Sequence, residues 1–570
     1  MEKPWYKFYD ESVPKHIDYP AIPLHELLKR SAEKHPDRVA LIYGAPLGSR
    51  YMAKKITFGE LDQLVTRFAA GLQKLGVKKG DRVAIYLPNC PQYIIAYYGA
   101  ARAGAVIVPC NPLYVARELE HQVNDSGAET LIALTAFYGN VKQVRANTPL
   151  KRVIVTSIKE YFPGLLRTLF TVAKEKKEGH ALSIEGEKDT YWFQDVLAGA
   201  PALQPVDIKP SDTLCLLYTG GTTGVPKGAG LSNSNLLANA LQTAAWFKAQ
   251  EAKETVLTAL PLFHSYGMTT CMNFAMATAA SMILIPNPRD YHGIMLAIKN
   301  FQPTVFPGVP TMYVAFNNFP NVQAYGVNSI RACISGAAGL PVEVQEKFQQ
   351  LTGGKLVEGY GLSEASPVTH ANPIYGQNKV GTIGIPFPDT DARIVDLETG
   401  TKELPVGEVG ELAVRGPQVM KGYWNKPDET AMVLRDGWLY TGDMARMDAD
   451  GYFQIVDRKK DMIITGGYNV YPRDVEEVLY EHPKIKEAVV AGVPDEYRGE
   501  MVKAYVVLKE GETATEEEII EFCRTRLAKY KVPRAVEFRK ELPKTMVGKI
   551  LRRLLVEEEK RKLAQKQQQG

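Results

Sequence analysis

The stretch YTGGTTGVPKG, residues 218–228, has the composition of a loop that holds phosphate. Its glycines allow close approach of the backbone to an anion, its threonines offer hydroxyl groups, and Lys227 supplies a cation. The pattern of a P-loop is absent, because Pro226 precedes Lys227 and Gly228 follows it. We interpret residues 219–227 as a phosphate-binding loop of another type, against the alternative of a glycine-rich surface turn.

Further stretches place charged or aromatic residues beside glycine or proline. They are PLFHSYGM (261–268), SGAAGLP (335–341), VEGYGLSEASP (357–367), GWLYTGD (437–443), DRKKDMIITGGYNVYP (457–472) and LPKTMVGKILRR (542–553). Taken alone, Tyr360 could be a core residue, Glu364 and Lys549 surface charges, and Asp443 a turn residue. Their chemistry therefore depends on the elements that position them.

Apolar runs separated by helical patterns indicate the main architecture. Residues 58–76 have apolar side chains at helical spacing, and buried strands are predicted at 82–88, 105–109, 130–134, 152–156 and 214–218. Strands that alternate with helices predict an α/β fold with a mostly parallel sheet covered on both faces. The phosphate loop follows the carboxyl end of strand 214–218, where open α/β sheets bind ligands.

The pattern changes after about residue 380, where short runs and turns such as 392–396, 410–416 and 451–457 indicate a β-rich part. A smaller α+β unit follows, with strands at 488–493 and 503–509 and a helix that begins after Thr515 in a capping box with Glu518. We expect a large N-terminal domain of doubly wound sheets at residues 1–457, β-rich from about 380, and a small C-terminal domain at 458–570.

The composition is that of an ordinary globular protein, with 570 residues, 45% hydrophobic, and a net charge of +4 that does not by itself indicate nucleic-acid binding. The six cysteines lack metal-ligand spacing, and the N-terminus lacks the apolar region of a secretion signal, so we expect a cytoplasmic protein. The apolar run 269–286 is too short and polar to span a membrane, and it predicts a buried helix leading into a strand.

Together the seven stretches resemble the adenylate-forming superfamily of acyl-CoA synthetases, luciferases and peptide-synthetase adenylation domains. They are most similar to those of the bacterial long-chain fatty-acid–CoA ligases, over roughly residues 25–555. The resemblance implies that a medium- to long-chain fatty acid reacts with ATP to give an acyl-adenylate and pyrophosphate. Coenzyme A would then displace AMP. ATP, Mg²⁺ and coenzyme A are the implied cofactor and substrates.

The resemblance also assigns the nucleotide site. Lys549, Glu364, Ser363 and Lys227 would be catalytic, with Lys549 between the carboxylate and the α-phosphate and Thr223 and Glu364 at Mg²⁺. Ser363 stands where the family usually has threonine. The implied ATP and AMP contacts are Thr219, Gly220, Gly221, Thr222, Thr223, Gly224, Lys227, Gly336, Ala337, Glu358, Gly359, Tyr360, Gly361, Ser363, Asp443, Arg458 and Lys549.

The remaining assignments concern the acyl group, coenzyme A and domain movement. The acyl and carboxylate pocket would contain His264, Tyr266, Gly336, Ala337 and Trp246, with Trp246 either a gate or ordinary core packing. Relatives rotate a mobile C-terminal domain between the half-reactions, which implies a hinge at Lys460. Coenzyme A would lie near Gly466, Gly467 and Asn469, unless this segment is a turn without a ligand.

Alternative functions remain open at this point. One is a fatty acyl-AMP ligase that passes the acyl group to a carrier protein, and another is a synthetase for an aryl or medium-chain carboxylate. Lys227, Glu364, Asp443, Arg458 and Lys549 argue against a non-catalytic acyl-nucleotide sensor. Beyond the substrates, the partners we consider are a membrane surface, contacted peripherally, and a second copy of the chain. No nucleic acid is expected.

Overall fold

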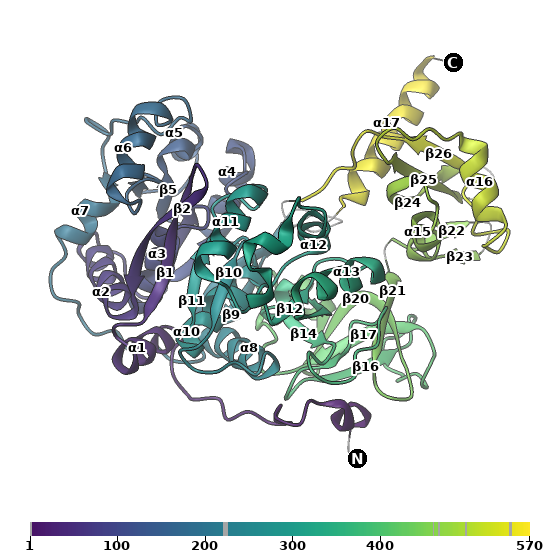
Figure 1. The fold of residues 1–570 in the computed structure, drawn as a ribbon, viewed down its shortest axis with the longest axis horizontal. Helices are drawn as coiled ribbons and strands as arrows, with labels where there is room; N and C mark the ends of the chain where they lie inside the picture. The colour runs from purple at the N-terminus through teal and green to yellow at the C-terminus, as the bar shows by residue number, and fades with distance from the viewer. Residues whose placement is uncertain are drawn as a thin grey trace. The chain divides into compact units, whose positions relative to one another are not determined.

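A computed structural model describes residues 3–219, 226–459, 461–465, 468–495, 499–545 and 550–569 (Figure 1). Internal contacts divide the chain into one unit of Met1–Asp391 and Arg415–Gly437, and a second of Ala392–Val414 and Trp438–Gly570. The β-rich part is thus split, and most of it lies in the second unit. The predicted domain boundary at residue 457 stays a prediction.

The largest sheet of the first unit has the strand order β18-β9-β8-β4-β3-β5-β6-β7. The central strands pair in parallel, as predicted, and β9 and β18 extend the sheet in antiparallel pairing. The bounds are β3 (Arg82–Tyr86), β4 (Val106–Pro109), β5 (Thr130–Leu134), β6 (Arg152–Thr156), β7 (Thr190–Trp192), β8 (Thr213–Thr219), β9 (Lys227–Ser232) and β18 (Gly422–Tyr423).

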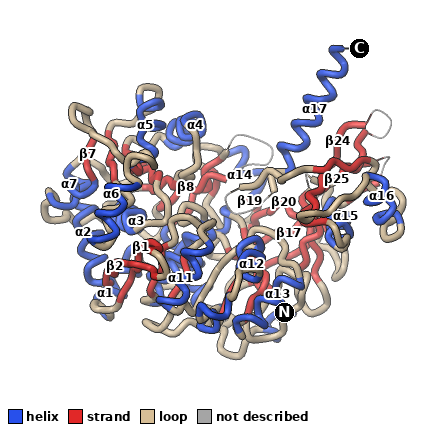
Figure 2. Tube along the Cα trace, turned by 45° about the horizontal axis from the view of Figure 1, so that its top comes forward, coloured by secondary structure: helices blue, strands red, loops and turns tan. Residues whose placement is uncertain are grey.

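Helices cover both faces of this sheet, which confirms the doubly wound prediction (Figures 1 and 2). Alternate residues of β3–β6 pack with α4 (Ala116–Ser126) and α5 (Tyr138–Arg145) in one core. On the other face, α3 (Pro91–Arg102) contacts β3 and β4. Helix α2 (Phe58–Lys74) packs on α3 and also contacts α7 (Phe193–Ala198). Thr57 and Glu60 form a capping box that starts α2 at the predicted position.

Two four-stranded sheets complete the first unit, in the orders β10-β11-β1-β2 and β12-β13-β14-β15. Their strands are β1 (Val39–Leu47), β2 (Arg50–Thr57), β10 (Thr255–Thr258), β11 (Ser281–Leu284), β12 (Ala332–Ser335), β13 (Lys355–Gly361), β14 (Val368–Ala371) and β15 (Ile385–Pro386). The other helices of eight or more residues are α1 (His25–Lys34), α6 (Gly164–Ala173), α8 (Asn233–Trp246), α11 (Tyr291–Phe301), α12 (Pro310–Asn317) and α13 (Val342–Thr352).

The apolar run 269–286 is buried inside this unit. It forms the π-helical segment η3 (Met268–Asn273), then α10 (Phe274–Thr278) and strand β11, which confirms the predicted helix-to-strand segment. In the part of the chain that the structure describes, no helix is both long and apolar enough to cross a membrane.

The second unit contains two sheets. In one, β16 (Asp391–Val395), β17 (Gly410–Arg415), β20 (Trp438–Met447) and β21 (Phe453–Arg458) are neighbours in that order. The other has the order β23-β22-β25-β24, with β26 parallel to β25, and comprises β22 (Ile463–Thr465), β23 (Tyr468–Val470), β24 (Ile485–Asp495), β25 (Gly499–Leu508) and β26 (Ala535–Phe538). Helices α15 (Pro472–Tyr480), α16 (Glu516–Arg524) and α17 (Arg552–Gln569) accompany it, which confirms the α+β prediction.

The capping box predicted at α16 is formed only in part. The Thr515 hydroxyl accepts a hydrogen bond from the Glu518 backbone N–H at 3.2 Å, as a cap requires. The Glu518 carboxylate, however, lies 2.7 Å from the Lys484 ammonium. An ion pair to a lysine outside the helix therefore engages the side chain that the capping box would use.

Candidate active site

The two ends of the predicted phosphate loop are held together by a β-hairpin. Thr219 at the end of β8 pairs with Lys227 at the start of β9. A side chain at Gly228 would place its Cβ 3.2 Å from the ring of Tyr218, so glycine fits this closely packed position. Gly220, Gly221, Thr222, Thr223 and Gly224 lie outside the described residues. The hairpin anchors their loop at the carboxyl end of a parallel strand, as predicted.

Lys227 has two partners that come from far along the chain. Its ammonium forms an ion pair with the carboxylate of Glu429, on helix α14 (Pro427–Val433). The same ammonium lies 5.2 Å from the centre of the Tyr423 ring, a cation–π contact. Tyr423 reaches this place because β18 pairs with β9 at Ala229. A cation that the sequence assigns to phosphate is thus held by an anion and an aromatic ring.

Tyr423 also binds the residue predicted to hold Mg²⁺. Its hydroxyl donates a hydrogen bond of 2.8 Å to Oε1 of Glu364. Burial raises the pKa of Tyr423 well above its ordinary value, and the charge of Glu364 raises it further. The phenol therefore stays protonated and remains a donor. The backbone of Glu364 is fixed as well, because its carbonyl accepts a hydrogen bond of 2.7 Å from the Met420 N–H.

Ser363 and Glu364 lie in a 3-10 turn, η6 (Ser363–Ala365), that follows β13 and contacts β8 and β9. The Ser363 hydroxyl is 3.3 Å from that of Ser265, at the start of α9 (Ser265–Gly267). The structure thus brings Lys227, Ser363 and Glu364 to one edge of the large sheet. These are three of the four residues predicted to be catalytic.

Glu364 suits the Mg²⁺ that the sequence predicts. It is half-buried, and within the described residues only Oε1 accepts a hydrogen bond, which leaves Oε2 available. Mg²⁺ in nucleotide sites is held by one or two carboxylates together with waters and substrate phosphates. The described residues contain no group of three or more histidine, cysteine or acidic side chains that could hold a metal ion by themselves. A single carboxylate beside a phosphate loop fits that mode of binding.

A second group of predicted residues surrounds the carboxyl ends of β12 and β13. The Tyr266 hydroxyl donates to the Ile334 carbonyl at 2.6 Å, and a Cβ at Gly336 would lie 3.1 Å from the Tyr266 ring. Ala337 has φ +70°, a left-handed conformation that is strained for alanine. Glu358, paired with Ser335, accepts a hydrogen bond of 3.1 Å from the Leu340 N–H and so holds the loop 335–341. Tight packing and this bond position the segment.

Tyr360 stands near the end of β13, where glycines flank it. Its ring is half-buried and meets the His370 ring edge-on, with 6.1 Å between the centroids. A Cβ at Gly359 would lie 2.7 Å from Ile334, and one at Gly361 would lie 2.2 Å from the Pro367 carbonyl oxygen. Both glycines are therefore required by close packing. A half-buried ring leaves a surface on which a base could stack.

His264 caps α9, where its Nδ1 accepts a hydrogen bond of 3.3 Å from the Tyr266 N–H. This contact places it beside Tyr266, and the assignment of both residues to a carboxylate pocket stays a prediction. Trp246 is buried at the end of α8, stacked on Phe387 at 4.6 Å, and its indole N–H donates to the Asn372 carbonyl at 3.0 Å. These are contacts of core packing, and the role of Trp246 as a gate stays a prediction.

The residues predicted to bind ribose form a pair within the second unit. Asp443 in β20 lies opposite Arg458 in β21, with 3.3 Å between the carboxylate Oδ1 and the guanidinium Nε. Asp443 is only 8% exposed and lies inside a strand, so it is not a turn residue. Nearby, the Gly442 N–H donates to Glu411 at 3.0 Å, and Glu411 is paired with Lys459 at 3.2 Å.

Several predicted residues lie outside the described part of the chain. They are Lys460, Gly466, Gly467 and Lys549, in addition to the loop residues 220–224. For Asn469 only the backbone is described, in β23 opposite Ile464. Their roles stay predictions.

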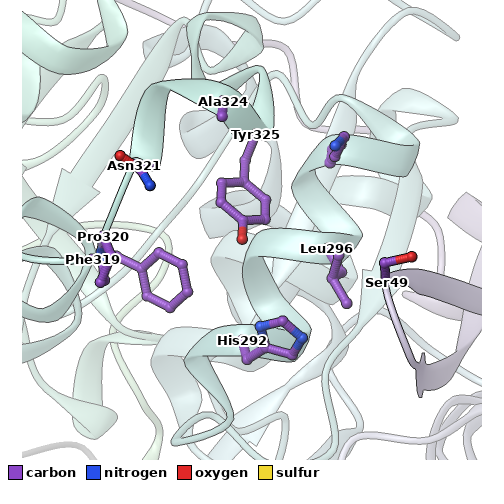
Figure 3. Close-up of a pocket in the computed structure, with 9 residues that line it drawn as sticks. Ser49, His292, Leu296, Phe319, Pro320, Asn321, Ala324 and Tyr325 are labelled. Atoms are coloured by element: carbon purple, nitrogen blue, oxygen red, sulfur yellow. The ribbon is translucent and has the colours of Figure 1, made fainter.

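A surface pocket of about 410 Å³ lies elsewhere in the first unit (Figure 3). It is lined by Ser49, His292, Leu296, Lys299, Phe319, Pro320, Asn321, Ala324 and Tyr325. None of the predicted site residues is among them. The pocket therefore does not bear on the nucleotide assignments.

Sequence reasoning missed Tyr423 and Glu429, although both contact predicted site residues. The motif around Glu364 ends at Pro367, and nothing in the local pattern of residues 418–433 indicates a return to the phosphate loop. The signal is a two-residue strand, Gly422–Tyr423, which is too short to recognise by alternation of polar and apolar residues.

Comparison with known proteins gives matches over nearly the whole chain. The family model described as AMP-binding enzyme matches residues 28–424, and that of the AMP-binding enzyme C-terminal domain matches 474–549. A long-chain-fatty-acid–CoA ligase of Bacillus subtilis (strain 168) is 48% identical over 566 residues, which are 98% of this chain and 98% of that protein.

Solved structures show the same fold. The crystal structure of ATP-bound MatB from Rhodopseudomonas palustris is 30% identical and matches with a TM-score of 0.80, over 94% of this chain and 99% of that one. An anthranilate CoA ligase in complex with anthranoyl-AMP is 26% identical, with a TM-score of 0.81 over 95% and 98% of the two chains. This chain belongs to the AMP-binding enzyme family, the adenylate-forming enzymes.

Proposed function

We propose that the chain is a long-chain fatty-acid–CoA ligase. It joins a medium- to long-chain fatty acid to coenzyme A through an acyl-adenylate and releases AMP and pyrophosphate. The observation that carries this proposal is the 48% identity to a long-chain-fatty-acid–CoA ligase across 98% of both proteins. ATP, Mg²⁺ and coenzyme A are the cofactor and co-substrates of this reaction.

The first half-reaction needs charge neutralisation, because a carboxylate attacks a phosphate that is itself anionic. In the proposal, the loop 219–227 and Lys227 hold the β- and γ-phosphates, and Glu364 with Thr223 holds Mg²⁺, which offsets phosphate charge when bound. Tyr360 stacks on adenine and Ser363 binds phosphate. Lys549 stabilises the charge that develops between carboxylate and α-phosphate. The proximity of Lys227, Ser363 and Glu364 supports this arrangement.

The second half-reaction is assigned to another orientation of the C-terminal domain, residues 458–570, about a hinge at Lys460. Asp443 and Arg458, which face each other across two strands, bind the ribose. Gly466, Gly467 and Asn469 lie along the route of coenzyme A. His264, Tyr266, Gly336 and Ala337 contact the carboxylate end of the acyl group, and the contact of Tyr266 with Gly336 supports their grouping.

Two alternative functions differ from this proposal in one substrate. One would use an aryl carboxylate, since the anthranilate CoA ligase shares the fold at 26% identity. The other would use a carrier protein in place of coenzyme A as the acyl acceptor. The greater identity to the long-chain ligase over the full chain favours a fatty acid and coenzyme A.

A product assay tests the proposal. Purified protein with ATP, Mg²⁺, coenzyme A and oleate should give oleoyl-CoA, AMP and pyrophosphate, detected by mass spectrometry and a pyrophosphate assay. A series from acetate to oleate, with benzoate and anthranilate included, should show the highest kcat/KM for medium to long chains. Release of ADP and phosphate, or a preference for the aryl acids, would refute it.

We further propose that the enzyme contacts membranes peripherally, because long-chain fatty acids partition into lipid. A homodimer is also proposed, with no surface assigned to it.

A further inference from the structure

Helix α6, Gly164–Ala173, packs on the first unit through the side that carries Leu166 and Phe170. Leu166 and Phe170 are buried, and Phe170 meets Phe162 and His180 edge-on at centroid distances of 5.8 and 5.4 Å. Phe162 in turn stacks on Tyr43 of β1 at 5.3 Å. These aromatic contacts fix the helix firmly, so that the orientation of its other side is determined. The helix lies at the edge of the first unit (Figure 1).

The outward side of α6 carries three large apolar side chains. Leu165 is 57% exposed, Leu169 is 41% exposed and Val172 is 84% exposed. At about 100° per residue they fall within an arc of about 60°, so they form a single stripe along the helix. Soluble proteins rarely expose contiguous apolar groups without a partner. The helix thus exposes an apolar stripe beside its packed side.

The charges beside this stripe are mostly positive. Lys174, Lys176 and Lys177 follow the helix and are exposed. Within the described residues, neither Lys176 nor Lys177 has a carboxylate partner, whereas Lys174 lies 3.5 Å from Glu178. The remaining acid of this turn, Glu175, is paired with Lys159 at 2.6 Å.

A further lysine approaches from another element. The ammonium of Lys54, an exposed residue of β2, lies 5.7 Å from the centre of the Tyr161 ring, just before α6. Lysines thus follow the helix at its C-terminal end, and another lysine contacts the segment just before its N-terminal end. A short helix with an exposed apolar stripe and flanking lysines is typical of segments that lie in the interface of an anionic bilayer.

We propose that the stripe Leu165–Leu169–Val172 with Lys54, Lys174, Lys176 and Lys177 is the surface by which this protein docks on anionic lipid membranes. The biological purpose of this docking rests on the proposed function, because a membrane is where a long-chain fatty acid is concentrated. The binding itself depends only on the surface. A lipid is favoured over a protein partner because the stripe is narrow and is flanked by exposed lysines.

Vesicle co-sedimentation tests the surface without any use of catalysis. Full-length protein should sediment with vesicles of phosphatidylcholine and phosphatidylglycerol, and far less with phosphatidylcholine alone. Leu165→Ser/Leu169→Ser/Val172→Ser should lower the bound fraction at least fivefold, and Lys176→Gln/Lys177→Gln should lower it on the anionic vesicles. Val342→Ser/Val380→Ser, which alters two exposed valines of the same unit outside α6, is the matched control and should bind as the parent does.

A fluorescent label shows which surface enters the lipid. The six native cysteines are buried, so a cysteine introduced at an exposed position can be labelled selectively. A bimane on Val172→Cys should shift its emission to the blue when anionic vesicles are added. The same label on Val342→Cys, 45% exposed in the same unit, should not shift.

The outcomes separate this inference from the proposed function. Absence of binding to either vesicle, equal binding of the serine variant and the parent, or a shift at residue 342 but not at 172 would overturn it. Absence of binding would leave a protein partner as the occupant of the stripe. The product assay with a soluble medium-chain acid should be unaffected by the serine variant, and failure of that assay in the parent refutes the ligase proposal alone.

Discussion

The hydroxyl of Tyr423 donates a 2.8 Å hydrogen bond to the carboxylate of Glu364, a residue 59 positions earlier in the chain. The ring of the same tyrosine receives the ammonium of Lys227 at 5.2 Å. One side chain therefore orients both the residue assigned to Mg²⁺ and the residue assigned to phosphate. Because burial keeps its pKa high, it remains a neutral donor throughout the ordinary pH range.

Tyr423→Phe should weaken Mg²⁺-dependent turnover without loss of the fold. Removal of one hydrogen bond to a charged group costs about 1.5 kcal/mol, which corresponds to about a tenfold fall in rate. A Mg²⁺ titration of acyl-adenylate formation should also show a higher half-saturating concentration. The turnover of Glu364→Gln should fall further, by about a hundredfold or more.

Tyr51→Phe is the matched control for Tyr423→Phe. It removes a buried tyrosine hydroxyl that donates to the Gly44 carbonyl at 3.0 Å, in a different sheet. It should lower stability but leave the Mg²⁺ titration unchanged. A shifted Mg²⁺ dependence in both variants, or in neither, would contradict a positioning role for Tyr423.

Glu429 should compete with nucleotide for Lys227. Their ion pair occupies the ammonium that the proposal assigns to the β- and γ-phosphates, so ATP must replace Glu429 as its partner. Lys227→Ala should raise the KM for ATP by about one to two orders of magnitude, as loss of a charge-assisted contact predicts. Glu429→Gln should lower this KM or leave it unchanged, as steady-state kinetics with varied ATP would show. A KM raised equally in both variants would mean that the pair must stay intact.

Lys549 and Lys460 should affect different half-reactions. Lys549→Ala should abolish acyl-adenylate formation and still convert supplied acyl-AMP and coenzyme A to the thioester. Lys460→Pro restricts φ to near −65° and should slow thioester formation while adenylation survives. Single-turnover kinetics of each half-reaction measure both. An equal loss of rate in both half-reactions of Lys549→Ala would mean that the lysine has a structural role or serves both steps.

His370 should make the protein sensitive to acid. Burial lowers its pKa from 6.5 to about 3, so the unfolded chain binds a proton between these values while the folded chain does not. The free energy of unfolding should therefore fall as pH drops below 6.5, by up to about 1.4 kcal/mol per pH unit from this group. Urea unfolding at pH 7 and at pH 5 measures this effect. Between the two pH values, His370→Gln should lose less unfolding free energy than the parent. The exposed His292→Gln is the control, and an identical loss in all three proteins would contradict the assignment.

Local sequence patterns were sufficient for the central strands of the large sheet. The apolar runs at 82–88, 130–134 and 214–218 became β3, β5 and β8, because strands covered on both faces must be apolar throughout. The helical spacing of apolar residues in 58–76 became α2, whose capping box of Thr57 and Glu60 was recognised only in the structure. At α16 the predicted capping box of Thr515 and Glu518 was only partly right, since Lys484, outside the helix, attracts the carboxylate of Glu518.

The sequence by itself determined which chemical groups this protein has and, through the order of its motifs, the family to which it belongs. Glycines, threonines and Lys227 beside a buried strand predict a phosphate-binding loop, because the features on which that prediction rests are local in the sequence. Only the tertiary structure decided that Tyr423 and Glu429 meet Lys227 and that Leu165, Leu169 and Val172 face outward together. A pairing between β18 and β9, and the choice of which side of α6 is covered, depend on packing between distant segments, and no local pattern encodes them.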